Sequence, residues 1–185
     1  MLYFFVILVI VAGLIFFVVS LYNGLVRGRN EVKSAWSSID VQLKRRYDLI
    51  PNLLETVKGY AAHERQTLEA VVKARQQAIH FTGSVEERAG VENALTLSLR
   101  SLFALAEAYP QLKANENFLA LQEELATTEN KIGFARQYYN DMAKSYKNRV
   151  EVFPSNMIAN MFGFKAEPFF QLETAGDRAV PQVKV

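Results

Sequence analysis

The chain has 185 residues, half of them hydrophobic, with 21 basic and 19 acidic side chains and no cysteine. A formal charge of +2 gives no general attraction to nucleic acid, so we expect no nucleic-acid partner. The absence of cysteine excludes a cysteine nucleophile; it fits a reducing compartment as well as a cysteine-free periplasmic protein.

From Met1 to Val19 every residue is apolar or aromatic apart from Gly13, and none is charged. A helix that continues to Leu21 is about 30 Å long, which is the thickness of one hydrocarbon core. A cleaved secretory signal would begin with basic residues and end at a small-residue cleavage site, and this segment has neither. We therefore favour a permanent anchor, with membrane lipid contacting residues 1–22.

Basic side chains follow the apolar segment at Arg27, Arg29 and Lys33, and none precedes it. Because basic flanks tend to stay on the cytoplasmic side, we expect the N-terminus outside and the body in the cytoplasm. The prediction is a single-pass protein of the bacterial inner membrane.

Small residues recur every four positions at the end of the apolar segment, at Ser20, Gly24 and Gly28. On a helix this spacing lines one face, where small side chains let a second transmembrane helix pack closely. The alternative is a hinge, because each glycine costs a helix about 1 kcal/mol relative to alanine.

Two helical segments are predicted around Pro51. The first continues the anchor and carries apolar residues at helical spacing: Leu25, Val32, Trp36, Ile39 and Leu43. The second starts near Pro51, with Asp48 as its cap, and carries Leu54, Val57, Ala61, Leu68, Val71 and Ala78. Residues 47–52 form either a tight turn or a kink.

Two further segments have clearer bounds. A capping box, Ser84-x-x-Glu87, opens a helix that stops at Pro110 and has the seam Val91, Leu95, Ser98, Leu102, Leu105 and Tyr109. The last long segment repeats its seam in steps of three and four, at Phe118, Leu121, Leu125, Thr128, Ile132, Ala135, Tyr139, Met142 and Tyr146. Such a seam is typical of a helical bundle or coiled coil.

These patterns predict an all-α protein whose single N-terminal transmembrane helix continues into an antiparallel bundle of long helices. We divide the chain into the anchor (1–22), the bundle (23–163) and a C-terminal tail (164–185). The tail is aromatic at first and loses its periodicity after Pro168.

Charged side chains fall on the apolar seams at Arg29, Arg46, Glu64 and Arg75. One interpretation is a contact site for an anionic group or a partner helix. The other, which we favour, is a buried ion pair that fixes helix register, with Glu64 paired to a seam arginine. Arg46 also ends a cationic triplet that begins at Lys44, and we interpret this triplet as a solvated face.

No recognised catalytic motif is present. His63-Glu64 begins like a zinc-peptidase helix, but Thr67 stands where the second histidine is required. Two histidines in all leave little material for a metal site. We expect no catalytic residues, no metal and no cofactor.

The C-terminal end of the bundle is rich in phenylalanine, at Phe153, Phe162, Phe164, Phe169 and Phe170. Ser155 is expected to cap a short helix here, and Gly163 to end it. The phenylalanines either fold back and plug the end of the bundle, which we favour, or form an exposed patch for the membrane or a partner.

Three ordered blocks of sequence stand out: RNEVKSAWSSIDVQLKRRYDLIPNLLETVKGYAAHE (29–64), YPQLKANENFLALQEEL (109–125) and FPSNMIANMFGF (153–164). With the N-terminal anchor, these blocks resemble the bacterial LemA family over residues 22–170. The resemblance implies an α-helical bundle on one membrane-spanning helix. It brings no established catalytic residues with it.

The leading hypothesis is a non-enzymatic, membrane-anchored helical scaffold. It would form a homo-oligomer or recruit an unidentified membrane or cytoplasmic protein. One alternative is a membrane-organising assembly that binds lipid through its aromatic end or basic face. Another is a ligand sensor or cryptic enzyme.

Overall fold

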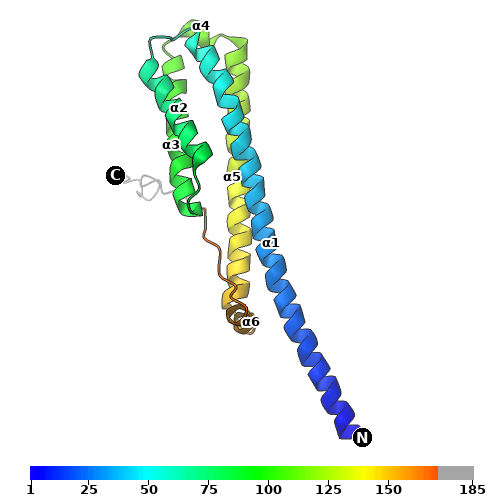
Figure 1. Cartoon of the computed structure of the whole chain (residues 1–185). Helices are drawn as coiled ribbons and strands as arrows, with labels where there is room; N and C mark the ends of the chain where they lie inside the picture. The colour runs from blue at the N-terminus through cyan, green and yellow to red at the C-terminus, as the bar shows by residue number, and fades with distance from the viewer. Residues whose placement is uncertain (171–185) are drawn as a thin grey trace, which may run out of the picture. The chain divides into compact units, whose positions relative to one another are not determined.

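The computed structural model describes residues 1–170, and every regular element in that range is a helix. In chain order the helices are α1 (Leu2–Lys58), α2 (Arg65–His80), α3 (Val85–Ala106), α4 (Pro110–Lys113), α5 (Glu116–Glu151) and α6 (Ser155–Met161) (Figure 1). The expected all-α class is confirmed. The predicted tail from residue 171 onward lies outside the described residues.

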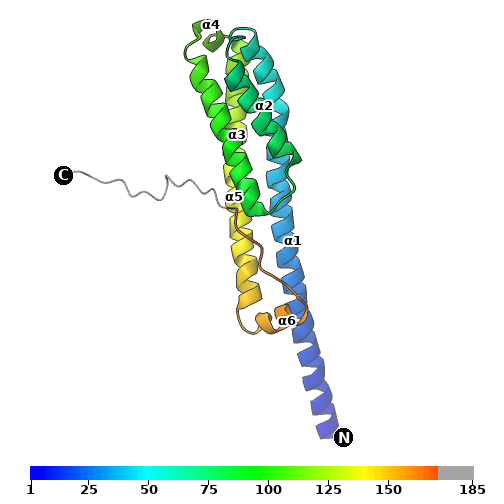
Figure 2. The ribbon, with the colours of Figure 1, turned by 60° about the vertical axis from the view of Figure 1, so that its left-hand side comes forward.

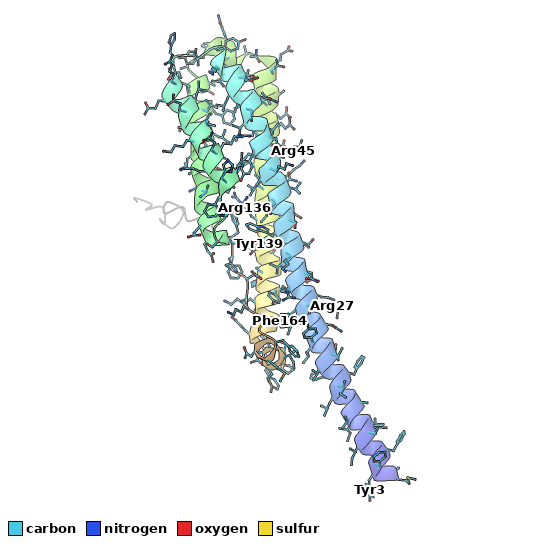
Figure 3. All side chains as sticks on the ribbon, in the orientation of Figure 1. Tyr3, Arg27, Arg45, Arg136, Tyr139 and Phe164 are labelled. Atoms are coloured by element: carbon cyan, nitrogen blue, oxygen red, sulfur yellow. The ribbon has the colours of Figure 1, made fainter. Side chains whose placement is uncertain are left out.

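Helix α1 carries the apolar segment and continues for 57 residues. It is the one helix within residues 1–170 that is long and apolar enough to cross a membrane. The side chains of residues 2–20 are all exposed, as Tyr3 is in Figure 3, which is the arrangement that lipid-facing residues require. The predicted continuation of the apolar helix into the packed helices is confirmed.

Pro51 lies inside α1, so the prediction that a new helix starts there is wrong. The chain leaves the helix after Lys58, and α2 begins only at Arg65. A proline inside a helix removes one backbone hydrogen bond and costs about 3 kcal/mol. Ile50 and Leu53, on either side of Pro51, are fully buried, and their packing holds this turn in the helix.

The described residues form two compact units. The first unit comprises Met1–Asp40 and Gly133–Phe169. In its core, α1 packs on α5, and Trp36 meets Tyr139 edge to face with ring centroids 5.4 Å apart. The other buried side chains of these two segments include Leu25, Val32, Ala35, Ile39, Ala143 and Tyr146.

The second unit comprises Val41–Ile132 with Phe170. In it the end of α1, then α2, α3 and the start of α5 run antiparallel, each reversing the direction of the one before (Figures 1 and 2). The predicted seams supply its core, which includes Leu43, Val57, Val71, Ala78, Leu95, Leu102, Phe118, Leu125 and Ile132.

The predicted start of α3 is confirmed. The Ser84 hydroxyl accepts a hydrogen bond from the Glu87 N–H, and the Glu87 carboxylate accepts one from the Ser84 N–H. This capping box satisfies two backbone donors that a helix start would otherwise leave free.

The ends of α6 match the prediction in part. Gly163 has a φ of 71° and follows α6, and the Phe164 N–H bonds back to the Ala159 carbonyl at 2.9 Å, as in a Schellman motif. Ser155 does not cap the helix as expected, because its hydroxyl donates to the Val152 carbonyl and Pro154 occupies the cap position.

Candidate functional site

A buried polar cluster surrounds Arg46 in the second unit. The Arg46 side chain is only 1% exposed, and its guanidinium donates to the Glu92 carboxylate, to the Glu129 carboxylate at 2.7 Å and to the Thr96 hydroxyl at 3.1 Å. Glu92 is completely buried, whereas Glu129 reaches the surface. Two carboxylates around one guanidinium offset the cost of burying its charge. Because Glu92 and Glu129 of the same chain already pair with the Arg46 guanidinium, Arg46 does not offer an open site for an external anion.

Tyr47 joins this cluster through its hydroxyl, which donates to the Glu92 oxygen that does not receive Arg46. Burial, and secondly the hydrogen bond to the Glu92 carboxylate, raise the pKa of the Tyr47 hydroxyl above its ordinary value near 10. Tyr47 is therefore a neutral donor at physiological pH. The cluster fixes the contacts of α1 with α3 and α5 within this unit.

Arg75 and Glu64 bond to other groups. Arg75 Nε donates to the backbone carbonyl of Tyr47 at 2.8 Å. Glu64 accepts a hydrogen bond from the Tyr109 hydroxyl at 2.9 Å, and this bond raises the pKa of Tyr109. The expected pairing of Glu64 with a seam arginine is wrong. Glu64 follows the end of α1, whereas Arg46 lies about three turns before that end.

In the first unit, Arg29 lies over the ring of Phe164, with the guanidinium carbon 5.1 Å from the ring centroid. This cation–π contact ties a predicted seam charge to the predicted aromatic end. Burial raises the pKa of the neighbouring Tyr146 hydroxyl, and the positive charge of Arg29 opposes that rise.

The predicted small-residue face is used differently along its length. A Cβ atom at Gly28 would lie 3.0 Å from Tyr146 Cδ2 and 3.2 Å from Arg149 Nη1, so Gly28 admits α5 of the same chain. Arg149 also donates to the Gly24 carbonyl at 3.1 Å. A Cβ atom at Gly24 would meet nothing within 4 Å, and Ser20 is exposed. Contact of Ser20 and Gly24 with a second copy stays a prediction.

The five phenylalanines of the aromatic end do not share one environment. Phe164 and Phe170 are buried and Phe169 is half-buried, whereas Phe153 and Phe162 are exposed. In the first unit the Lys147 ammonium lies 5.9 Å from the centroid of the Phe169 ring. Some members of this group thus fold inward, as we favoured, and others remain on the surface.

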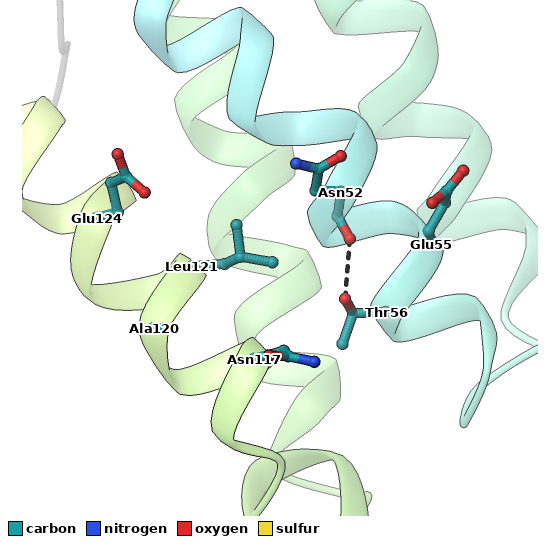
Figure 4. Close-up of a pocket in the computed structure, with 7 residues that line it drawn as sticks. All are labelled: Asn52, Glu55, Thr56, Asn117, Ala120, Leu121 and Glu124. Carbon is teal, nitrogen blue, oxygen red and sulfur yellow. Dashed lines mark hydrogen bonds between the residues drawn. The ribbon is translucent and has the colours of Figure 1, made fainter.

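A groove of about 410 Å³ opens in the second unit between the end of α1 and the start of α5 (Figure 4). Its lining consists of Asn52, Glu55, Thr56, Asn117, Ala120, Leu121 and Glu124. The Thr56 hydroxyl donates to the Asn52 carbonyl at 2.9 Å, and Glu124 forms an ion pair with Arg45 at 2.7 Å. The lining offers hydrogen bonds but no activated nucleophile. Within residues 1–170 no three side chains of the metal-binding kinds come together.

Sequence reasoning missed Glu92, the most deeply buried acid of the cluster. The buried face of α3 consists of Ala89, Glu92, Leu95, Leu99, Leu102 and Ala106. The predicted seam places Val91, four residues before Leu95, on the buried face. In the structure the buried residue is Glu92, three residues before Leu95. The three-residue step from Leu95 back to Glu92 places an acidic side chain on the apolar face of this helix. An acid there is a natural partner for Arg46, which also falls on an apolar seam, so this spacing could have predicted the pair.

A family model described as the LemA family matches residues 35–185. The chain belongs to the LemA family. This LemA-family chain is 26% identical over 174 residues to Protein LemA of Metamycoplasma hominis, covering 91% of this chain and 78% of that protein. It is 23% identical to Magnetosome protein MamQ 2 of Paramagnetospirillum magneticum, covering 86% and 68%. It is also 23% identical to Magnetosome protein MamQ of Magnetospirillum gryphiswaldense, covering 94% and 75%.

The family match of this LemA-family chain includes the whole Arg46 cluster and all of α6. The match begins at residue 35, after the apolar part of α1. The names of these relatives state no enzymatic reaction.

Proposed function

We propose that this LemA-family chain is a non-enzymatic, membrane-anchored helical scaffold that self-associates or recruits protein partners at the bacterial inner membrane. The observation that carries the proposal is the continuity of α1, which joins the apolar segment to helices of both units. Association of the apolar segments would therefore bring the attached helices of two copies together.

The interior of the second unit supports the same proposal. Arg46 and Tyr47 both donate to Glu92, and a buried network of this kind stabilises a fold rather than activating a substrate. In this proposal, partner proteins bind the exposed surfaces of the helices.

For the orientation we propose the N-terminus outside and the body in the cytoplasm, because Arg27, Arg29 and Lys33 follow the apolar segment. The chain has no cysteine, so a cysteine introduced at the exposed Ser37 would be its only thiol. Labelling of that thiol in intact cells by a membrane-impermeant reagent would contradict this orientation.

Purification of the full chain in a mild detergent tests the scaffold. We expect a species heavier than the 21.0 kDa chain in its detergent micelle, or a protein that co-purifies in fixed proportion. A strictly monomeric chain without a partner would count against the proposal. A small molecule or metal bound in fixed proportion in native mass spectra would favour the sensor or enzyme alternative instead.

A further inference from the structure

Helix α6 and its flanks leave an apolar surface uncovered in the first unit. Its exposed members, which we call the α6 patch, are Val152, Phe153, Met157, Met161 and Phe162. Met161 and Phe153 are the most open, at 75% and 73% exposed, whereas Ile158 and Ala159 of the same helix are buried. Large apolar side chains that are exposed and clustered in this way mark a contact with a membrane or a partner.

The segment that carries the α6 patch has no charged side chain. Glu151 is the last charge before it and Lys165 the first after it. Moving a charge out of water is costly unless the charge is paired, but this segment can leave water without that cost. Its polar residues are confined to Ser155, Asn156 and Asn160.

Contacts with α1 fix the location of the patch within the first unit. The ring of Tyr22 meets Phe162 edge-on with centroids 4.9 Å apart, and meets Phe164 in the same way at 5.6 Å. In both views of the ribbon α6 lies beside α1 (Figures 1 and 2). The patch is therefore held at the level of Tyr22.

Tyr22 marks the end of the membrane-spanning part of α1. The apolar residues before it form about 30 Å of helix, one hydrocarbon core, and tyrosine is enriched where such helices meet the headgroups. Arg27 follows at just over one further turn and is exposed. An element packed on Tyr22 thus lies at the boundary between the acyl chains and the headgroups.

We propose that the α6 patch inserts into this boundary, in the leaflet from which α1 emerges, so that the chain touches the bilayer at two places. Methionine side chains adapt to irregular apolar surroundings, and the exposed Arg27 and Lys165 suit anionic headgroups. A second copy fits less well. A patch on one seven-residue helix and its flanks is small beside the roughly 800 Å² that each partner buries in a standard interface.

The proposal rests on the membrane anchoring in the proposed function, but not on the scaffold role. The test therefore uses the full chain in lipid nanodiscs that hold one copy each, made of phosphatidylethanolamine and phosphatidylglycerol. Since the chain has no cysteine, a single thiol introduced by Met161→Cys can carry an environment-sensitive fluorophore. The matched control is Ser37→Cys, an exposed position of α1 about 22 Å beyond Tyr22 at helical rise.

The readout is quenching by lipids that carry a nitroxide just below the headgroup. We expect severalfold stronger quenching at position 161 than at position 37, and emission shifted to the blue at position 161. Adding Met157→Glu to the Met161→Cys chain should reduce the quenching toward the level of the control, because a carboxylate resists leaving water.

Equal and weak quenching at both positions would overturn the proposal. Blue-shifted emission at position 161 without lipid quenching would also overturn it, since protein would then cover the patch. Because each disc holds one copy, a chain that neither self-associates nor recruits a partner would still show the expected quenching. Failure of the scaffold role and failure of this inference are thus distinguishable.

Discussion

The side chain of Arg75 supplies the hydrogen bond that Pro51 denies to Tyr47. In an unbroken helix the carbonyl of Tyr47 would accept the N–H of residue 51, and proline has none. Arg75 Nε, from α2, donates to that carbonyl at 2.8 Å. A helix can therefore pass through Pro51, because a neighbouring helix satisfies the acceptor that proline leaves free.

Replacing Arg75 tests this relationship. We expect Arg75→Met to lower the free energy of unfolding by about 1–3 kcal/mol, because the Tyr47 carbonyl loses its donor while the apolar stem is kept. Chemical unfolding of the full chain in detergent measures this.

The matched background is Pro51→Ala, which restores the N–H at position 51. In that background the cost of Arg75→Met should fall to less than half, since the carbonyl regains a helical partner. An equal cost in both backgrounds would contradict the account.

The buried Arg46–Glu92 ion pair should contribute far more to the free energy of unfolding than the adjacent exposed pair of Arg45 and Glu124. We expect Glu92→Gln to cost about 3 kcal/mol, because it removes one charge of a buried ion pair. Arg45→Ala is the control: it breaks the exposed pair with Glu124 and should cost at most about 1 kcal/mol. Similar costs for the two variants would show that the buried pair does not hold the unit together.

The raised pKa of Tyr47 leads us to expect a loss of folding stability at high pH. Its folded-state pKa is raised above the ordinary value near 10, first by burial and then by Glu92. The stabilisation that follows is complete below about pH 10, and is lost as the pH rises from there toward the folded-state pKa.

The comparison is Tyr47→Phe, which cannot ionise. Melting temperatures of the two chains are measured from neutral pH to above pH 10. Above pH 10 the melting temperature should fall more steeply for the native chain than for the variant. Parallel curves for the two chains would refute the assignment.

Gly24 and Gly28 of α1 should respond oppositely to substitution. Gly24→Ala should stabilise the chain by up to about 1 kcal/mol, because a Cβ atom meets nothing within 4 Å and alanine favours a helix. Gly28→Val should destabilise it, because even a Cβ atom would lie 3.0 Å from the buried Tyr146. Thermal unfolding in detergent compares the two, and destabilisation by both would mean that Gly24 is packed too.

Much of the fold could be predicted because its signals are local and repeated. The seam of α5 runs from Phe118 to Tyr146 in steps of three and four, and this spacing determines which face of the helix is buried. The capping box at Ser84 and the glycine after α6 are local devices as well, and both were placed correctly.

The errors arise where distant residues decide a local outcome. Pro51 indicates a helix boundary by its residue type alone, but Arg75 satisfies the carbonyl of Tyr47, 28 positions before Arg75 in the chain. The partner of Arg46 depends on how α3 is rotated, and a choice between Val91 and Glu92 decides it. Burial of each phenylalanine at the aromatic end depends on how the segment after α5 folds back, which periodicity does not report.

Crosslinking in living cells tests the scaffold most directly. A photoreactive residue is placed at the exposed positions Ser20 and Gln122, and the same cells kept in the dark serve as the control. If the chain is a scaffold, light converts part of the 21.0 kDa chain into adducts, either with a second copy or with one recurrent protein identified by mass spectrometry. Only the free chain at both positions, in light as in the dark, would contradict it.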